Sequence, residues 1–194
     1  AAASFLNWSI YALMNISHTG CATLVAQAIG RDNKQESYRI IREAFWLSLI
    51  VSLIIMLVLY FSAELIFIKM GLDQTTASMA LDYFKIMIYG LPVVFLLQLQ
   101  GQIFNAYGDT KTSTAVMLFI LLLNVILDPI LIFGAFGIPA FGIKGAAVAT
   151  VMCHTFGVVI RTYYLWHKKY IPNLKVIFPI SSSRLKSIMA IGVP

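Results

Sequence analysis

Residues 112–135 read TSTAVMLFILLLNVILDPILIFGA, an apolar run that carries one amide, Asn124, and one carboxylate, Asp128, in its interior. At roughly 1.5 Å per residue, this run makes about 36 Å of helix, which is enough to cross a bilayer. Asn124 and Asp128 are four residues apart, so their side chains share one helix face. Pro129 has no N–H, so the carbonyl of Val125 loses its helical donor.

An acidic side chain inside a membrane helix is costly to bury. On insertion scales a carboxylate at the bilayer centre costs about 2.5 to 3.5 kcal/mol, so it normally faces a protein interior or a wet cavity and has a partner. Asp128 is therefore the predicted functional residue of this run. The alternative is that Asp128 and Asn124 form a purely structural hydrogen-bonded pair between helices.

The composition predicts a polytopic membrane protein. Hydrophobic residues make up 60% of the chain and charged residues only 11%, whereas soluble domains are nearer to half apolar. The net charge of +6 does not indicate nucleic acid, because the basic residues lie in short segments between apolar runs instead of along one face. Such segments are typical of cytoplasmic membrane loops.

Apolar runs and the polar segments between them predict five membrane spans. The predicted spans are 1–30, 44–63, 86–107, 112–135 and 145–164. Residues 64–85 are expected to form a looser connection, and 165–186 a longer one before a further span that starts at 187–194. Because the chain begins inside an uncharged run, we expect it to be a piece of a longer protein.

The distribution of lysine and arginine predicts the orientation of these spans. Most of these residues lie in the connections 31–43, 108–111 and 161–186, which are therefore expected on the cytoplasmic side of a plasma (inner) membrane. Asp128 then lies about 24 Å from the cytoplasmic end of its span, at roughly 1.5 Å per residue, in the outer half of the bilayer.

Four segments resemble the multidrug and toxic compound extrusion (MATE) transporters. They are ATLVAQAIGRDNKQ at 22–35, GDTKTS at 108–113, NVILDPILIFG at 124–134 and GIKGAAVAT at 142–150. The resemblance implies an all-α membrane helix bundle of twelve helices in two lobes, which exchanges organic compounds for Na⁺ or H⁺. This chain would correspond to helices two to six of the amino-terminal lobe and the start of helix seven.

The resemblance also implies functional residues. Asn124, Asp128 and Thr150 match a proton or cation site, so the coupling ion is H⁺ or Na⁺, with no other metal and no cofactor. The implied substrate-cavity residues are Gln98, Met117 and His154. The partners are small organic substrates, membrane lipids, and the first helix and carboxy-terminal lobe of the same protein, which this chain lacks. A further aspartate of the family site belongs to that first helix.

The predicted function is cation-coupled export of drugs and other organic compounds, and not an enzymatic reaction. A flippase for lipid-linked saccharides is one alternative, but it would be expected to line its cavity with several cationic residues, and outside the basic connections the predicted spans contain none. An intramembrane enzyme such as a prenyltransferase is another. Such enzymes need clustered aspartates for Mg²⁺-diphosphate, and the motif NVILD supplies only Asp128.

Overall fold

The computed structural model describes residues 18–69 and 74–171, and within them the chain is helical apart from its connections. The described helices are 18–30, α2 (Lys34–Lys69), α3 (Gln74–Ala106), α4 (Thr110–Phe133) and α5 (Ile143–His167). Helices α2 to α5 are each long and apolar enough to cross a membrane. The predicted all-helical membrane bundle is confirmed, whereas the expectations for 1–17 and 172–194 lie outside the described residues.

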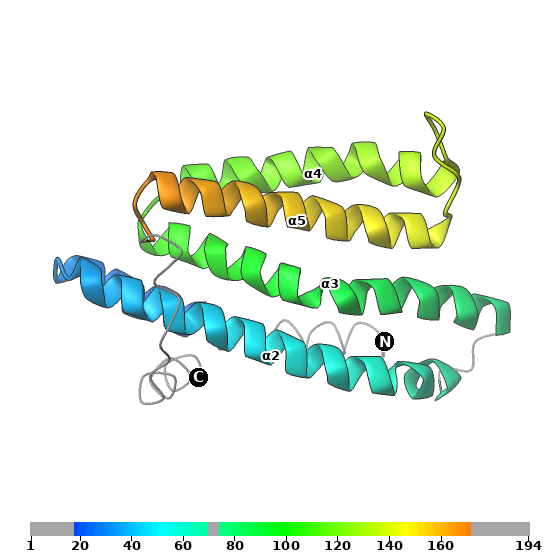
Figure 1. Cartoon of the computed structure of the whole chain (residues 1–194), viewed down its shortest axis with the longest axis horizontal. Helices are drawn as coiled ribbons and strands as arrows, with labels where there is room; N and C mark the ends of the chain where they lie inside the picture. Colours follow the sequence, from blue (N-terminus) through cyan, green and yellow to red (C-terminus); the bar gives the residue numbers. More distant parts are fainter. Residues whose placement is uncertain (1–17, 70–73, 172–194) are drawn as a thin grey trace.

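Helix α3 is the centre of the described bundle. Figure 1 shows it between α2 on one side and the α4–α5 pair on the other, and it contacts all three. The connections 31–33, 107–109 and 168–171 gather at one end of the bundle, here called the basic end. The connection 134–142 lies at the other end, here called the loop end.

The hydrophobic core lies between the helices, and the outer faces are also apolar. One cluster at the basic end joins the helix 18–30 to α2, α3 and the last turns of α5, with Phe104 and Leu165 buried at its centre. A second cluster joins α3, α4 and α5. Large apolar side chains point outward, including Phe61 at 79% exposure and Leu122 at 64%. Such surfaces are suited to lipid.

The expected looser connection at 64–85 is wrong for most of its length. Helix α2 continues to Lys69 and α3 already begins at Gln74. The charged residues in this stretch lower its hydropathy, but charged residues such as Lys and Glu are good helix formers. The stretch contains no proline, and its single glycine is Gly71. Hydropathy therefore marks where the apolar run ends, which is not where the helix ends.

The connection 134–142 holds α4 and α5 close together at the loop end. The backbone N–H groups of Phe141 and Gly142 donate to the carbonyls of Leu131 and Ile132, at 3.0 and 3.1 Å, in the last turn of α4. The first turn of α5 then approaches so closely that a Cβ on Gly145 would lie 2.3 Å from the Leu131 carbonyl oxygen. Only glycine fits there, so the small residues of this segment permit near-contact between two helix backbones.

Candidate functional site

Asn124 and Asp128 lie one turn apart on α4, and their side chains are in contact. Asn124 Nδ2 donates a hydrogen bond of 3.0 Å to Asp128 Oδ1, and both residues are half-buried. Pro129 lies inside the same helix, so the carbonyl of Val125 lacks the N–H that would otherwise bond to it. These groups lie in the half of α4 that is nearer to the loop end.

Helix α5 places Cys153 against this pair. Asn124 Nδ2 lies 4.0 Å from Cys153 Sγ, a long hydrogen bond to sulfur, and Cys153 is only 1% exposed. Thr150 lies three residues earlier on α5, and its hydroxyl donates to the carbonyl of Ala146 at 2.9 Å. The structure thus brings Asn124, Asp128 and Cys153 together, while the Thr150 proton is bonded within its own helix.

The hydrogen bonds of this cluster use its donors and leave oxygen lone pairs. A carboxylate has only acceptors, an asparagine amide has two N–H donors and one oxygen, and a hydroxyl has one donor and two lone pairs. The Asn124 amide nitrogen contacts Asp128 and Cys153, and the Thr150 proton is bonded to Ala146. Among the described residues, the second Asp128 oxygen, the Asn124 oxygen and the Thr150 lone pairs are left without a hydrogen bond, and oxygen ligands suit a hard cation.

The three predicted substrate-cavity residues lie on three different helices. Gln98 on α3 is exposed, and Met117 on α4 is 52% exposed. His154 on α5 is half-buried, and its Nδ1 atom is buried with no hydrogen-bond partner among the described residues. Within the described part of the chain, no hydrogen bond or ion pair joins these side chains to one another. A shared substrate cavity therefore stays a prediction.

A groove of about 380 Å³ lies between α4 and α5, and none of the predicted site residues lines it. It is lined by Thr112, Ala115, Val116, Phe119, Ile160 and Tyr164. The α4 residues of this lining recur three and four positions apart, so they form one stripe of the helix, and Asn124 and Asp128 lie on another. Within the described residues, no group of three or more His, Cys, Asp or Glu is placed to hold a metal ion.

The ranges predicted from the sequence placed Arg161 both in the span 145–164 and in the basic connection 161–186, and only the first placement is right. Arg161 lies in α5 and is 4% exposed. Its Nη1 donates to the Leu97 carbonyl of α3 at 2.7 Å, and its Nη2 donates to the carbonyl and hydroxyl of Ser113 on α4, at 3.0 and 3.3 Å. Gly101 leaves room for the guanidinium, because a Cβ there would lie 3.0 Å from Nη1.

The position of Arg161 changes one argument made from the sequence. A cationic residue does lie within a membrane-crossing helix, contrary to the expectation of none. Its guanidinium bonds to protein oxygens of two neighbouring helices and is buried, so it does not line an open cavity. The apolar and aromatic residues at 163–166, shortly after Arg161, were the available signal that the helix continues.

Gln100 forms a matching link from α3 to α5, and nothing in the sequence distinguishes it from the neighbouring glutamines. It is 8% exposed, and its Nε2 donates to the Thr162 hydroxyl at 2.8 Å and to the Val158 carbonyl at 3.3 Å. A side chain of α3 thus bonds to the backbone of α5, while Arg161 of α5 bonds to the backbone of α3. These reciprocal bonds fix the two helices in one register.

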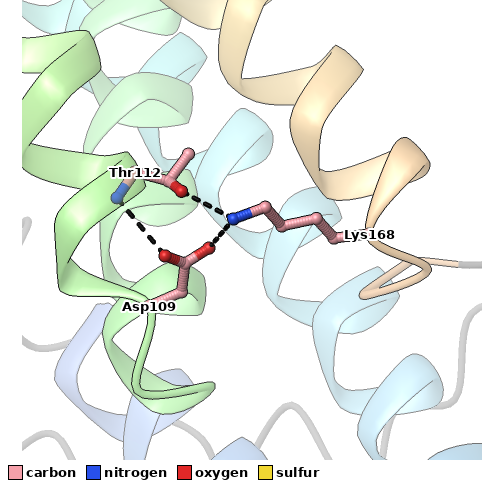
Figure 2. Close-up of polar contacts among 3 residues, drawn as sticks. All are labelled: Asp109, Thr112 and Lys168. Atoms are coloured by element: carbon pink, nitrogen blue, oxygen red, sulfur yellow. Dashed lines mark hydrogen bonds and ion pairs between the residues drawn. The ribbon is translucent and has the colours of Figure 1, made fainter.

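Figure 2 shows an ion pair that joins α4 to the end of α5 at the basic end. Asp109 accepts a hydrogen bond of 3.3 Å from the Thr112 N–H, and Lys168 Nζ lies 2.5 Å from Asp109 and 2.7 Å from the Thr112 hydroxyl. Partial burial alone would raise the pKa of Asp109, but bonds from Lys168 and Thr112 outweigh it and lower the pKa. The hydrogen bond to Asp109 raises the pKa of Lys168.

Comparison with known families identifies this arrangement of helices. The family model MatE matches residues 1–130 of the 194. The chain belongs to the MATE family. This membership confirms the resemblance seen in the sequence, and it places the chain among multi-pass membrane transporters.

Individual relatives agree with the family model. The chain is 28% identical over 187 residues to the "Probable multidrug resistance protein NorM" of Thermotoga maritima. This match covers 96% of this chain and 40% of that protein. It is 32% identical over 131 residues to the protein of the same name from Oceanobacillus iheyensis, covering 68% of this chain and 29% of that one. The MATE chain described here thus spans about 40% of the length of such relatives.

Solved MATE structures have the same fold. The inward-facing conformation of a multidrug resistance MATE transporter matches with a TM-score of 0.84 at 25% identity, covering 94% of this chain and 41% of that one. The outward-facing conformation of such a transporter matches with a TM-score of 0.83 at 26% identity, covering 100% and 43%. The relatives are named as multidrug resistance proteins, which are transporters, so the flippase and enzyme alternatives are not favoured.

Proposed function

We propose that this chain is part of a cation-coupled antiporter that exports drugs and other organic compounds, with Asn124, Asp128 and Thr150 as its proton or cation site. The observation that carries the proposal is the Asn124–Asp128 pair, which lies within a membrane-crossing helix and has acceptor oxygens to which no described residue bonds. Intramembrane carboxylates are usually functional, because a purely structural role can be filled at lower cost by neutral groups.

The geometry supports two modes of coupling. A proton needs only the free oxygen of Asp128, whereas Na⁺ needs several oxygens, which Asn124, Asp128 and Thr150 can supply together. Either ion cancels the negative charge that the Asn124 amide now stabilises, so the hydrogen bond between Asn124 and Asp128 weakens. For export, the cation and the drug must each favour a different conformation of the transporter.

The likeness to two conformations supports a lobe that moves as a unit. Structures described as inward-facing and outward-facing match this chain almost equally well. A segment that keeps one fold in both states can change its tilt relative to the remainder of the protein without being repacked. We place the basic end on the cytoplasmic side of the plasma (inner) membrane, and substrate contacts at Gln98, Met117 and His154.

The test is drug efflux from vesicles that contain the full-length transporter, with H⁺ and Na⁺ gradients imposed separately. We expect Asp128→Asn to abolish gradient-driven efflux, because the neutral amide cannot exchange a proton and binds cations poorly. The gradient that drives the wild type identifies the ion. Asp82→Asn is the matched control, because the Asp82 side chain is 45% exposed and pairs with Lys144 at 2.9 Å, and we expect this variant to export normally. Normal efflux by a correctly inserted Asp128→Asn variant would refute the proposed site.

A further inference from the structure

Cys153 lies on α5 in contact with Asn124, and the family resemblance implied no role for it. Its sulfur lies 4.0 Å from Asn124 Nδ2, while the same nitrogen donates to Asp128 Oδ1 at 3.0 Å. The two hydrogens of one amide group are thus directed at two fixed acceptors, one on its own helix and one on the neighbouring helix. Because an amide group is planar, two contacts at its nitrogen also fix the orientation of its oxygen.

The position of the sulfur is fixed by its surroundings. Cys153 is 1% exposed and packs in the cluster formed by Leu97, Val116 and Ile120. Its helix is held against α4 by the close approach at Gly157, where a Cβ would lie 2.3 Å from Ile120 Cδ1. A buried thiol in such packing has little freedom to turn away, so its contact with Asn124 is a property of the helix pair.

We propose that Cys153 is a positioning residue of the cation site: its sulfur holds the second N–H of Asn124 and thereby directs the Asn124 oxygen to the bound cation. This inference rests on the proposed function of Asn124 and Asp128. Without the sulfur, the Asn124 amide keeps only its bond to Asp128 and can rotate, so its oxygen is less often aligned for binding. The chemistry of export is unchanged, but more cation is needed to occupy the site.

The experiment compares two substitutions of Cys153 in the full-length transporter. Cys153→Val fills the space but has no acceptor, whereas Cys153→Ser has an acceptor but fills less space. If hydrogen bonding matters, the valine variant needs about five-fold more of the driving cation for half-maximal efflux, as expected for loss of one weak hydrogen bond, at an unchanged maximal rate. The serine variant stays closer to the wild type. If only packing matters, the serine variant is the more impaired of the two.

The controls separate this inference from the proposed function. Cys21→Val changes another fully buried cysteine, which packs among the helices of the basic-end cluster, and we expect no change in cation dependence. If Asp128→Asn abolishes gradient-driven efflux while the valine and serine variants of Cys153 match the wild type, the role of Cys153 is refuted and the site stands. If Asp128→Asn exports normally, the site itself is refuted.

Discussion

The two ends of the α4–α5 pair are held together by different forces. At the basic end the links are polar: Arg161 bonds to Ser113, and Lys168 bonds to Asp109. At the loop end the two helices meet through bare backbone, where Gly145 lies against the carbonyl of Leu131. One end therefore depends on directional bonds between side chains, and the other on close packing of small residues.

This difference explains why the candidate site lies in the half of the pair near the loop end. Packing uses no polar atoms, so the oxygens of Asn124 and Asp128 are not needed to hold the helices and stay available for a ligand. At the basic end the polar groups already bond to each other, as Arg161 does with Leu97 and Ser113. A binding site in a membrane bundle needs unused polar side chains, and they occur where backbone packing and backbone hydrogen bonds hold the helices together.

The largest effect is expected from Gly145→Ala, which disrupts the close packing of α4 and α5 at the loop end. The added methyl would lie 2.3 Å from a backbone oxygen, which cannot move aside as a flexible side chain can, so α4 and α5 must separate. We expect the free energy of unfolding of the full-length transporter in detergent to fall by about 3 kcal/mol, at the upper end for overpacking. Separation of the helices should also lower the cation affinity of the site.

Gly30→Ala is the matched control for this substitution. Gly30 also lies in a helix, and nothing lies within 4 Å of the position its Cβ would take. We expect it to leave the free energy of unfolding unchanged or to raise it slightly, because alanine favours helix. Equal stability of the Gly145 and Gly30 variants would show that packing does not hold the loop end.

Local spacing predicts the helices and the Asn124–Asp128 contact, because both depend on residues within a few positions of each other. The apolar run at 112–135 predicts α4 to within two residues at each end. The four-residue spacing predicts that Asn124 and Asp128 share a face, and the structure places them in hydrogen-bond contact. Whether they bind a cation stays a prediction.

Contacts between helices could not be predicted from spacing. The partners of Arg161 lie 64 and 48 residues away in the sequence, and the partner of Cys153 lies 29 residues away. A hydropathy profile records that Arg161 is charged. It does not record that carbonyls on two other helices accept hydrogen bonds from its guanidinium group. It therefore does not distinguish this buried arginine from the basic residues of the connection that follows.

A smaller effect is expected at the basic end, from substitutions of Arg161. Arg161→Lys keeps the charge but replaces a planar fork with a single ammonium, which cannot reach both Leu97 and Ser113 in the same way. We expect a loss of about 2 kcal/mol in the free energy of unfolding, as for a lost hydrogen bond to a charged group. Arg161→Met removes the charge together with its bonds and should cost less. A methionine variant less stable than the lysine variant would contradict this account.

The smallest effect is expected from the ion pair of Asp109 and Lys168, which lies partly in solvent. The pKa of Asp109 is below its ordinary value of 3.8, so its contribution is complete above that pH and is lost as the pH falls through the lowered pKa. The pKa of Lys168 is above its ordinary value of 10.5, so its contribution is lost only as the pH rises through that raised pKa. Between these limits the contribution is constant.

Asp109→Asn tests this pair, because asparagine also caps helices well but carries no charge. The difference in unfolding midpoint between wild type and variant should be small and constant near neutral pH, and it should shrink below about pH 4 as Asp109 becomes protonated. Added salt should also reduce it, because the Lys168 side chain is 33% exposed and the pair is screened. If the difference persists unchanged in acid, Asp109 acts only as the N-cap of α4. Arg161 then holds the basic end without help from this ion pair.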